Sequence, residues 1–313
     1  MAFLEAEIKR GVRALLGTPP KAGRLQAGSG ICRLAINRRL RVETEEAGVK
    51  HAHMAMRPNP DAPTDPQLGL LRVVGRDEEI LLLNYACHPT TRGGFIISGD
   101  YPAAAMRELR ADGSGRREVM FLQGGCGDLR VPCMNPEKNA FRGGDATDVI
   151  AYGNVIAGAA RKILARGLHT LAPAFRAART EFILPYDFNA APPTAAEATL
   201  AYRRLVAGRL KHENADGVPL EWVAWELAPE CRLLALPGEV CHAIARKSKR
   251  LAGGAYPFFL GYANGCPTYI PTDTIISEGG YEGRGCMIGY GQPYPFRPGS
   301  EAVIYEQLRA ILQ

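Results

Sequence analysis

Four polar side chains follow short apolar segments of the sequence, at points where a buried strand would end. They are His88, Asp128, Glu239 and Asn264. The histidine is the clearest, because the mostly apolar residues 80–86 lead into it and Pro89 follows at once, and proline cannot continue a strand ladder. In open α/β sheets, ligands bind at the carboxyl ends of strands. Imidazole and carboxylate groups gathered there could bind a metal ion or act as acid and base.

Each of these features also has an ordinary structural interpretation. A histidine at a strand end can be satisfied by backbone groups, Gly127-Asp128 can form a turn, and Pro237-Gly238-Glu239 can begin a helix. A functional site is favoured because several ligand-type groups occur at strand ends together, which is what a site built from several loops requires.

Two other candidates carry less weight. Cys87 could be a nucleophile with His88 as its base, but neighbouring side chains in a strand point to opposite faces and would not meet. His51 and His53 form a His-x-His pair that could bind a metal from one face of a strand. Their polar surroundings, just before the proline-rich residues 57–66, favour a solvated loop instead.

The elements that would position these side chains alternate between strands and helices. This order predicts a single α/β domain over residues 1–313, with mixed sheets flanked by helices and the active site at the C-terminal ends of strands. The expected helices cover residues 3–16, 101–110, 145–166, 194–212, a segment starting at 239, and 300–312. The expected strands cover residues 24–41 around a turn at Gly28-Ser29-Gly30, then 69–74, 79–86, 119–122, 175–184 and 257–262, with a further strand within 225–236 that stops at Pro237. An irregular region follows to Pro298.

Composition and charge narrow the class of protein. The 313 residues are 46% hydrophobic and 22% charged, as in soluble globular proteins with a large core. The net charge of +6 is spread in short clusters that are not interleaved with aromatic residues, so we expect no nucleic-acid partner. No apolar run approaches the roughly 18 residues of a transmembrane helix, so we expect no transmembrane segment.

The eight cysteines are scattered singly and form no CxxC pair, which excludes a zinc ribbon and a thioredoxin motif. A disulfide framework is not expected in a chain of this length, and a reducing, cytoplasmic compartment fits better. The start of the sequence lacks the basic and apolar regions of a signal peptide. The HExxH, Walker A, GxSxG and GxGxxG motifs are absent as well, so serine hydrolases, NTPases and dinucleotide enzymes have no local support.

Several runs of the sequence, taken in order, resemble the neutral/alkaline (non-lysosomal) ceramidase family, in particular its shorter bacterial relatives of unassigned substrate. No single run is diagnostic, but the ordered set is specific and spans residues 35–283. The matching runs are Ala35-Ile36-Asn37-Arg38-Arg39, residues 84–90 with Ser98-Gly99-Asp100, Phe121-Leu122-Gln123-Gly124 with Gly127-Asp128, Leu236-Pro237-Gly238-Glu239, Gly261-Tyr262-Ala263-Asn264, Tyr269-Ile270-Pro271-Thr272 and Gly280-Tyr281-Glu282-Gly283.

This resemblance implies a zinc-dependent hydrolase of linear amides, of the N-acylsphingosine amidohydrolase type, in which zinc-bound water attacks the amide carbonyl. By motif, it implies that His88, Glu239 and Tyr269 are zinc ligands and that Arg38 and Tyr281 stabilise the oxyanion. The chemistry is consistent with these roles, since zinc accepts imidazole and carboxylate ligands and brings the pKa of bound water near ~7. Guanidinium and phenol donors suit a developing oxyanion.

Two further residues, Asp100 and Asp128, suit either support of a ligand or a purely structural role. The expected partner of the chain is a small-molecule or lipid amide, with the oligomeric state open.

The sequence departs from the family at two places. The family carries a His-x-His run upstream of Ile-Asn-Arg that supplies another zinc ligand and the general base, and we expect this chain to begin downstream of it, N-terminally incomplete. Gly127-Asp128 is followed here by Leu129-Arg130, whereas ceramidases have a serine-containing segment, which bears on sphingolipid specificity. The alternative hypothesis is therefore a degenerate, non-catalytic member that acts as a binding or scaffold protein.

Overall fold

The structure, a computed structural model, describes residues 2–46, 48–113, 115–190 and 216–313. It has the mixed α/β architecture predicted from the sequence. The helix expected over residues 194–212 lies outside the described residues. The strands are β1 (Arg24–Ile31), β2 (Ile36–Glu46), β3 (Val49–Asn59), β4 (Gln67–Val74), β5 (Glu79–Tyr85), β6 (Arg117–Gln123), β7 (Leu129–Arg130), β8 (Met134–Asn135), β9 (Ala140–Phe141), β10 (His169–Thr170), β11 (Arg176–Pro185), β12 (Gly217–Ala228), β13 (Cys231–Ala235), β14 (Glu239–Val240), β15 (Tyr256–Leu260) and β16 (Tyr269–Ile270). The helices are α1 (Ala2–Leu16), α2 (Asp100–Ala111), the 3-10 turn η1 (Pro136–Lys138), α3 (Ala146–Ala165), α5 (His242–Ala252), α6 (Asp273–Glu278), the π-helical turn η3 (Tyr281–Gly285), α7 (Cys286–Gly289) and α8 (Ser300–Leu312).

Two larger sheets form the body of the fold. The first has the strand order β10-β1-β4-β5-β6, and the second has the order β11-β12-β13-β15. Each sheet is antiparallel except for one parallel pair, β5 with β6 and β13 with β15. Parallel neighbours end at the same edge of a sheet, so the loops that follow β5 and β6 leave side by side.

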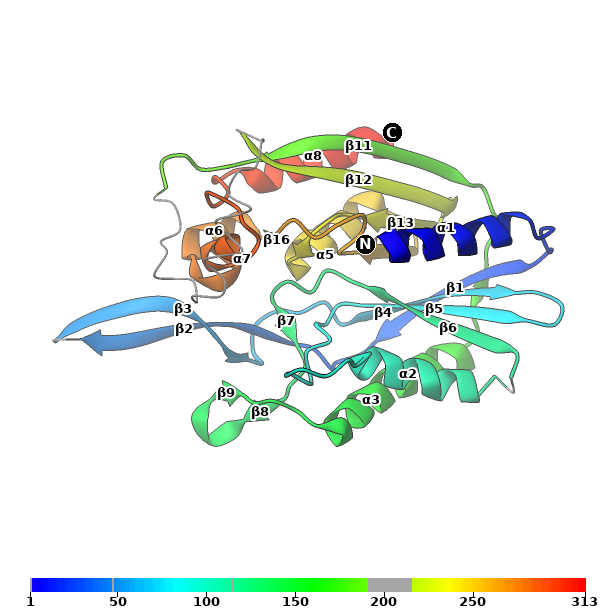
Figure 1. The fold of residues 1–313 in the computed structure, drawn as a ribbon, viewed down its shortest axis with the longest axis horizontal. Helices are drawn as coiled ribbons and strands as arrows, with labels where there is room; N and C mark the ends of the chain where they lie inside the picture. The colour runs from blue at the N-terminus through cyan, green and yellow to red at the C-terminus, as the bar shows by residue number, and fades with distance from the viewer. Residues whose placement is uncertain (1, 47, 114, 191–215) are drawn as a thin grey trace.

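The two sheets pack face to face between outer helices. Figure 1 shows α2 and α3 outside the first sheet and α8 along β11 and β12 on the opposite side. The interface between the sheets is apolar and includes Leu71 of β4, Leu233 of β13 and Phe258 of β15. Helices α2 and α3 cover a separate apolar cluster on the outer face of the first sheet. The arrangement is a four-layer sandwich in which each sheet buries both faces.

The expected turn at Gly28-Ser29-Gly30 is wrong, because β1 runs straight through these residues and pairs with β4 along its length. The glycines serve a close approach of helix and sheet instead. A Cβ at Gly28 would lie 2.5 Å from Leu168 Cδ2, and one at Gly30 would lie 2.7 Å from Ile163 Cγ1. Small residues are needed there because the side chains of Ile163, in α3, and Leu168, just after it, pack against the strand.

The expected loop around His51 and His53 is also wrong. Both histidines lie on β3, which pairs with β2 in a long antiparallel hairpin. The hairpin projects from the body as an arm at the left of Figure 1. Both side chains are exposed, and their polar character reflects a two-stranded ribbon in water rather than a loop.

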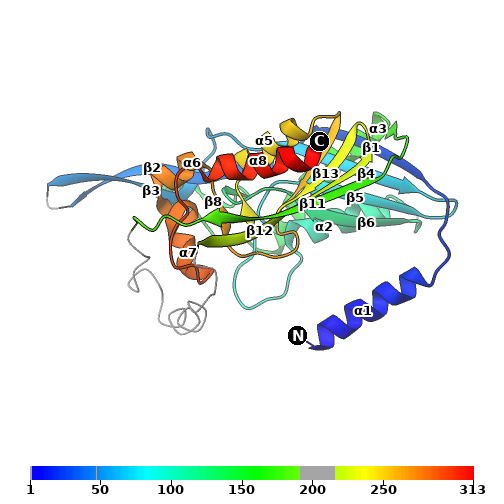
Figure 2. The same ribbon diagram turned by 90° about the horizontal axis from the view of Figure 1, so that it is seen from above.

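Helix α1 stands apart from the body, as Figure 2 shows. None of its residues is buried, although its sequence has the apolar spacing of an amphipathic helix. Among the described residues, no helix is long and apolar enough to cross a membrane.

The strand expected within residues 225–236, ending before Pro237, is β13. Two expectations about the second half of the chain need correction. Glu239 does not start a helix, because it lies in the two-residue strand β14 and α5 begins at His242. The region up to Pro298 is not irregular throughout, since it contains α6, η3 and α7. Short helices rich in glycine escape detection by periodicity.

Candidate active site

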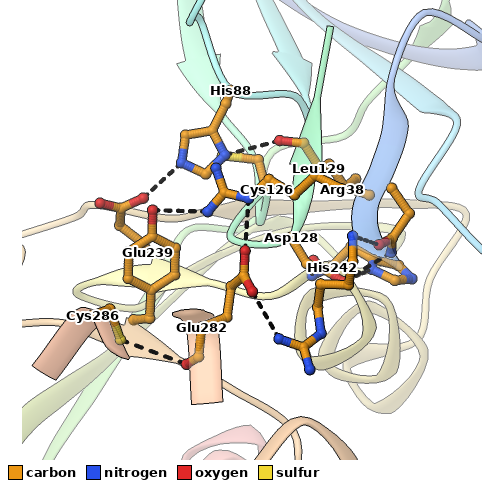
Figure 3. A network of polar contacts seen from close by, with 12 residues as sticks. Arg38, His88, Cys126, Asp128, Leu129, Glu239, His242, Glu282 and Cys286 are labelled. Atoms are coloured by element: carbon orange, nitrogen blue, oxygen red, sulfur yellow. Dashed lines mark hydrogen bonds and ion pairs between the residues drawn. The ribbon is translucent and has the colours of Figure 1, made fainter. Parts of the chain in front are cut away.

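His88 follows β5 and is held in place by backbone groups of the loop after β6. Its N–H donates to the Leu129 carbonyl at 3.3 Å, and its Nδ1 donates to the same oxygen at 2.9 Å. The ring nitrogen Nε2 therefore points away from this anchor, toward Glu239 Oε2 at 2.6 Å. Figure 3 shows the imidazole and the carboxylate facing one another. The residue is only 5% exposed.

Glu239 reaches His88 because of a tight local structure. Gly238 has φ of 90° and its missing Cβ would lie 2.6 Å from the Thr268 carbonyl oxygen, so only glycine fits there. Glu239 then pairs with Tyr269 in the parallel bridge of β14 and β16. This pairing brings two residues that we expect to be zinc ligands onto adjacent strands.

The charges of this pair are set by burial and by each other. Burial alone would raise the pKa of Glu239, but the hydrogen bond and charge of His88 outweigh it and lower the pKa to about 2. Burial alone would lower the pKa of His88, but the nearby Cys126 sulfur and the Glu239 carboxylate outweigh it and raise the pKa to about 10. With these pKa values, the two side chains form an imidazolium–carboxylate ion pair at neutral pH.

Two tyrosines that sequence reasoning did not assign complete the surroundings of Glu239. The Tyr262 hydroxyl lies 3.0 Å from His88 Nε2 and donates to Glu239 Oε2 at 3.0 Å. The Tyr290 hydroxyl donates to the other carboxylate oxygen. Tyr262 also has φ of 58°, a conformation that bulky residues rarely adopt and that clusters at functional sites. A sequence signal existed only for Tyr262, which lies in a run shared with the ceramidase family.

Arg38 joins this cluster to a second buried carboxylate. Its Nη2 donates to the Tyr269 hydroxyl at 3.0 Å, and its Nε donates to Glu282 Oε1 at 2.7 Å. Arg39, the next residue, donates through Nη1 to Glu282 Oε2 at 2.7 Å. Glu282 is only 2% exposed, so one buried carboxylate holds two guanidinium groups. Glu282 lies in the matching run Gly280-Tyr281-Glu282-Gly283, but no role was expected for it.

Tyr281 lies at the outer side of the same cluster. Its ring packs edge-to-face on Tyr269 with centroids 5.3 Å apart, and the Arg38 guanidinium lies 5.9 Å from its centroid. It is 42% exposed, whereas Tyr269 is 4% exposed. Burial holds the pKa of Tyr269 above its usual range, so this phenol keeps its proton in the metal-free chain. The structure thus brings all five residues, Arg38, His88, Glu239, Tyr269 and Tyr281, into one region.

The remaining candidates lie elsewhere or have structural partners. Asn264 is exposed and donates to Glu221 Oε2 at 2.9 Å. Cys87 is completely buried, and burial raises the pKa of its thiol far above the usual value, which argues against a nucleophile. Asp100 accepts hydrogen bonds from Thr91 N at 3.0 Å and Thr91 Oγ1 at 2.6 Å. It braces the loop that follows His88.

Asp128 is bound to His242 rather than to His88. Its carboxylate accepts from His242 N at 2.8 Å, from His242 Nδ1 at 2.6 Å and from Asn37 Nδ2 at 3.2 Å. These bonds connect the loop after β6, the base of β2 and the start of α5. Burial alone would raise the pKa of Asp128, but attraction to His242 and its hydrogen bonds lower the pKa to about 2.

The lowered pKa of Asp128 predicts how the free energy of unfolding depends on pH. Because folding lowers the pKa of Asp128 from its ordinary ~3.9, its contribution is fully present above pH ~4 and is lost as the pH falls through about 2. The contribution is on the order of 2 kcal/mol. The free energy of unfolding, measured with urea between pH 5 and pH 2.5, should fall less steeply with decreasing pH in Asp128→Asn than in the wild type. The exposed control Asp77→Asn should keep the wild-type slope, and equal slopes for all three chains would contradict the assignment.

Among the described residues, no group of three or more His, Cys, Asp or Glu side chains lies where it could hold a metal ion. The candidate donors are instead one imidazole, one carboxylate and a phenol, each of a type that zinc accepts in proteins. The imidazolium proton lies between Nε2 of His88 and the carboxylate of Glu239, two groups of the kinds that ligate zinc. A metal ion would replace that proton, so the residues present fit zinc in kind.

Comparison with solved structures identifies the fold. The chain matches neutral ceramidase from Pseudomonas aeruginosa with a TM-score of 0.67 and 16% sequence identity, over 93% of this chain and 52% of that one. It matches a ceramidase complexed with C2 with a TM-score of 0.66 and 16% identity, over 93% of this chain and 53% of that one. The chain thus spans about half the length of these structures. No protein-family model and no curated protein matches the sequence. The described residues therefore have a neutral ceramidase-like fold.

Proposed function

We propose that the chain is a zinc-dependent hydrolase of linear amides whose reaction is of the ceramidase type. The observation that carries this proposal is the hydrogen bond between His88 and Glu239, 2.6 Å long, made by residues 151 positions apart. Two strand ends deliver an imidazole and a carboxylate to one buried point, beside the Arg38–Tyr269 pair. Such buried polar groups are costly unless they are paired or used.

In this proposal, His88 Nε2, the Glu239 carboxylate and Tyr269 would hold a zinc ion. The bound ion would act as a Lewis acid and make a water molecule acidic enough to be a nucleophile at neutral pH. With two strong donors and a phenol whose pKa burial raises, we expect weaker affinity than at sites with three histidine or carboxylate ligands.

The other side chains position the reactants. Arg38 and Tyr281 would donate to the oxyanion that forms when the amide carbonyl is attacked, as preorganised donors do in acyl transfer. Glu282 fixes the Arg38 guanidinium, because its Oε1 accepts a hydrogen bond from Arg38 Nε at 2.7 Å. The hydroxyls of Tyr262 and Tyr290 fix both oxygens of Glu239, so this carboxylate has little freedom to rotate.

A second candidate is a non-catalytic binding or scaffold protein with the same fold. The observation that favours it is the direct ion pair between His88 and Glu239, which is a self-sufficient structural contact without a metal. The two candidates differ in metal content and in turnover.

The test measures both properties on the same protein. The wild type, His88→Ala and the control His169→Ala, whose exposed imidazole pairs with Glu230, are equilibrated with zinc, and the metal bound per chain is determined. Each is then assayed with a panel of N-acyl amides that includes ceramides, and released fatty acid is quantified. We expect about one zinc and turnover in the wild type and the control, and neither in His88→Ala. A wild type that binds no zinc and hydrolyses no amide overturns the proposal and supports the non-catalytic alternative, whereas zinc binding without turnover overturns the hydrolase assignment.

A further inference from the structure

Four buried side-chain atoms among the described residues have no hydrogen-bond partner, and two of them belong to residues that contact each other. The four are Arg72 Nε, Thr90 Oγ1, Arg130 Nε and Ser248 Oγ. Arg130 and Thr90 are in direct contact, since Arg130 Nη2 donates to the Thr90 carbonyl at 3.2 Å. Buried donors and acceptors left unpaired are costly and need an explanation. Two adjacent ones point to a ligand that supplies both partners.

This pair flanks the candidate active site. Thr90 is two residues after His88, and Arg130 forms a parallel β-bridge with His88. On the other side, Arg130 pairs with Ile36 and Leu129 pairs with Asn37 in the register of β2 and β7. Side chains alternate along a strand, so Arg130 projects from the same face of this ribbon as Ile36 and Arg38.

The charge of Arg130 is not neutralised within the described chain. No carboxylate lies within ion-pair distance of it there, in contrast to Arg38, which is paired with Glu282 at 2.7 Å. The nearby acid, Asp100, uses its oxygens on the loop after His88. Instead, the Arg130 guanidinium stacks over Phe141 at 4.7 Å from the ring centroid.

The environment of Arg130 is also unfavourable to its charge. Arg130 is only partly exposed, and burial disfavours a charged group. A half-buried cation of this kind is stabilised by an anion that forms charge-assisted hydrogen bonds with it. The planar guanidinium offers N–H donors in a fixed fork that matches a carboxylate, with Nε among them.

We propose that Arg130 and Thr90 form a subsite for a carboxylate on the substrate, so that the preferred substrates are N-acyl compounds with an acidic group, such as N-acyl amino acids, rather than neutral ceramides. The inference rests on the proposed function and adds the substrate class. The guanidinium binds the carboxylate through Nε, and the Thr90 hydroxyl donates to it. Arg38 and Tyr281 then remain for the amide carbonyl.

The test uses two probes that share an acyl chain and an amide bond, N-dodecanoylglycine and its neutral counterpart N-dodecanoylglycinamide. The wild type should favour the acid by at least about tenfold in kcat/KM, as expected for a charge-assisted hydrogen bond. Arg130→Gln should bring the ratio close to one, and Arg130→Lys should give an intermediate ratio because it keeps the charge without the fork. The control Arg142→Gln changes an exposed arginine that is paired with Asp148, and it should keep the wild-type ratio.

If Arg130→Gln does not fold, Thr90→Val answers the same question. It removes the hydroxyl at nearly constant shape and should reduce the ratio.

Equilibrium binding of the two probes, measured by calorimetry, separates this inference from the proposed function. If neither probe is hydrolysed but the wild type binds the acid more tightly and Arg130→Gln does not, the subsite stands and the hydrolase proposal fails. Equal treatment of both probes by the wild type, in binding or in turnover, overturns the subsite. A preference that persists in Arg130→Gln overturns it as well.

Discussion

A Glu239→Gln chain is expected to lose amide hydrolysis by at least about 100-fold and to bind little zinc. The substitution keeps the size of the side chain but removes the negative charge that His88 Nε2 faces at 2.6 Å. It also replaces one carboxylate oxygen by an amide nitrogen, which cannot accept a hydrogen bond, so the bond donated by either Tyr262 or Tyr290 is lost. The effect should appear in kcat rather than in KM, because the lost group acts on the reacting centre and not on the acyl chain.

The matched control for this experiment is Glu118→Gln, because its side chain is 71% exposed and pairs only at the surface with Arg110. It should retain full zinc content and turnover. Glu239→Gln with normal zinc content and normal kcat would show that this carboxylate is structural, and the proposed metal site would then be wrong.

A Glu282→Gln chain is expected to be less stable by about 3–5 kcal/mol, because removing one partner of a buried ion pair leaves uncompensated charge. Here the loss affects two cations at once, since Arg38 and Arg39 each donate to this carboxylate at 2.7 Å. The free energy of unfolding can be measured by urea denaturation at neutral pH.

Glu278→Gln is the control for this second experiment, because it removes another partner of the same Arg39. The Glu278 side chain is 41% exposed, so the loss should be within about 1 kcal/mol. If both variants lose the same amount, burial does not govern the strength of these pairs, and the account of Glu282 given above is wrong.

The architecture could be predicted from local sequence patterns because alternation and helical spacing are local properties. The β5 strand and its exit at His88 are an example, since the apolar run and Pro89 define both. The structural role of the glycines was harder to predict, because glycine occurs both in turns and where a helix packs closely on a strand. Gly28 and Gly30 make room for Ile163 and Leu168, which lie over 130 positions away and leave no mark on the neighbouring sequence.

The candidate site could be predicted only in part, for a similar reason. Resemblance to a family brought Arg38, His88, Glu239, Tyr269 and Tyr281 together before any geometry was known, and their roles stay predictions. Tyr290 carried no signal, and Glu282 lay in a run that resembles the family without any role attached to it, because the importance of both comes from the distant groups that they contact. A glutamate that follows a tyrosine looks like any surface glutamate until its 2% exposure and its two arginine partners are seen.

The long sequence separation within the site has a consequence for folding kinetics. The bond between Arg38 and Glu282 joins residues 244 positions apart, and that between His88 and Glu239 joins residues 151 apart. Closing such loops lowers the conformational entropy of the chain before the stabilising contacts form. Topologies rich in distant contacts therefore fold slowly. The hairpin of β4 and β5 can form early, but the site needs both ends of the chain. During refolding, binding and activity should therefore return only with the slowest phase, after most secondary structure has formed.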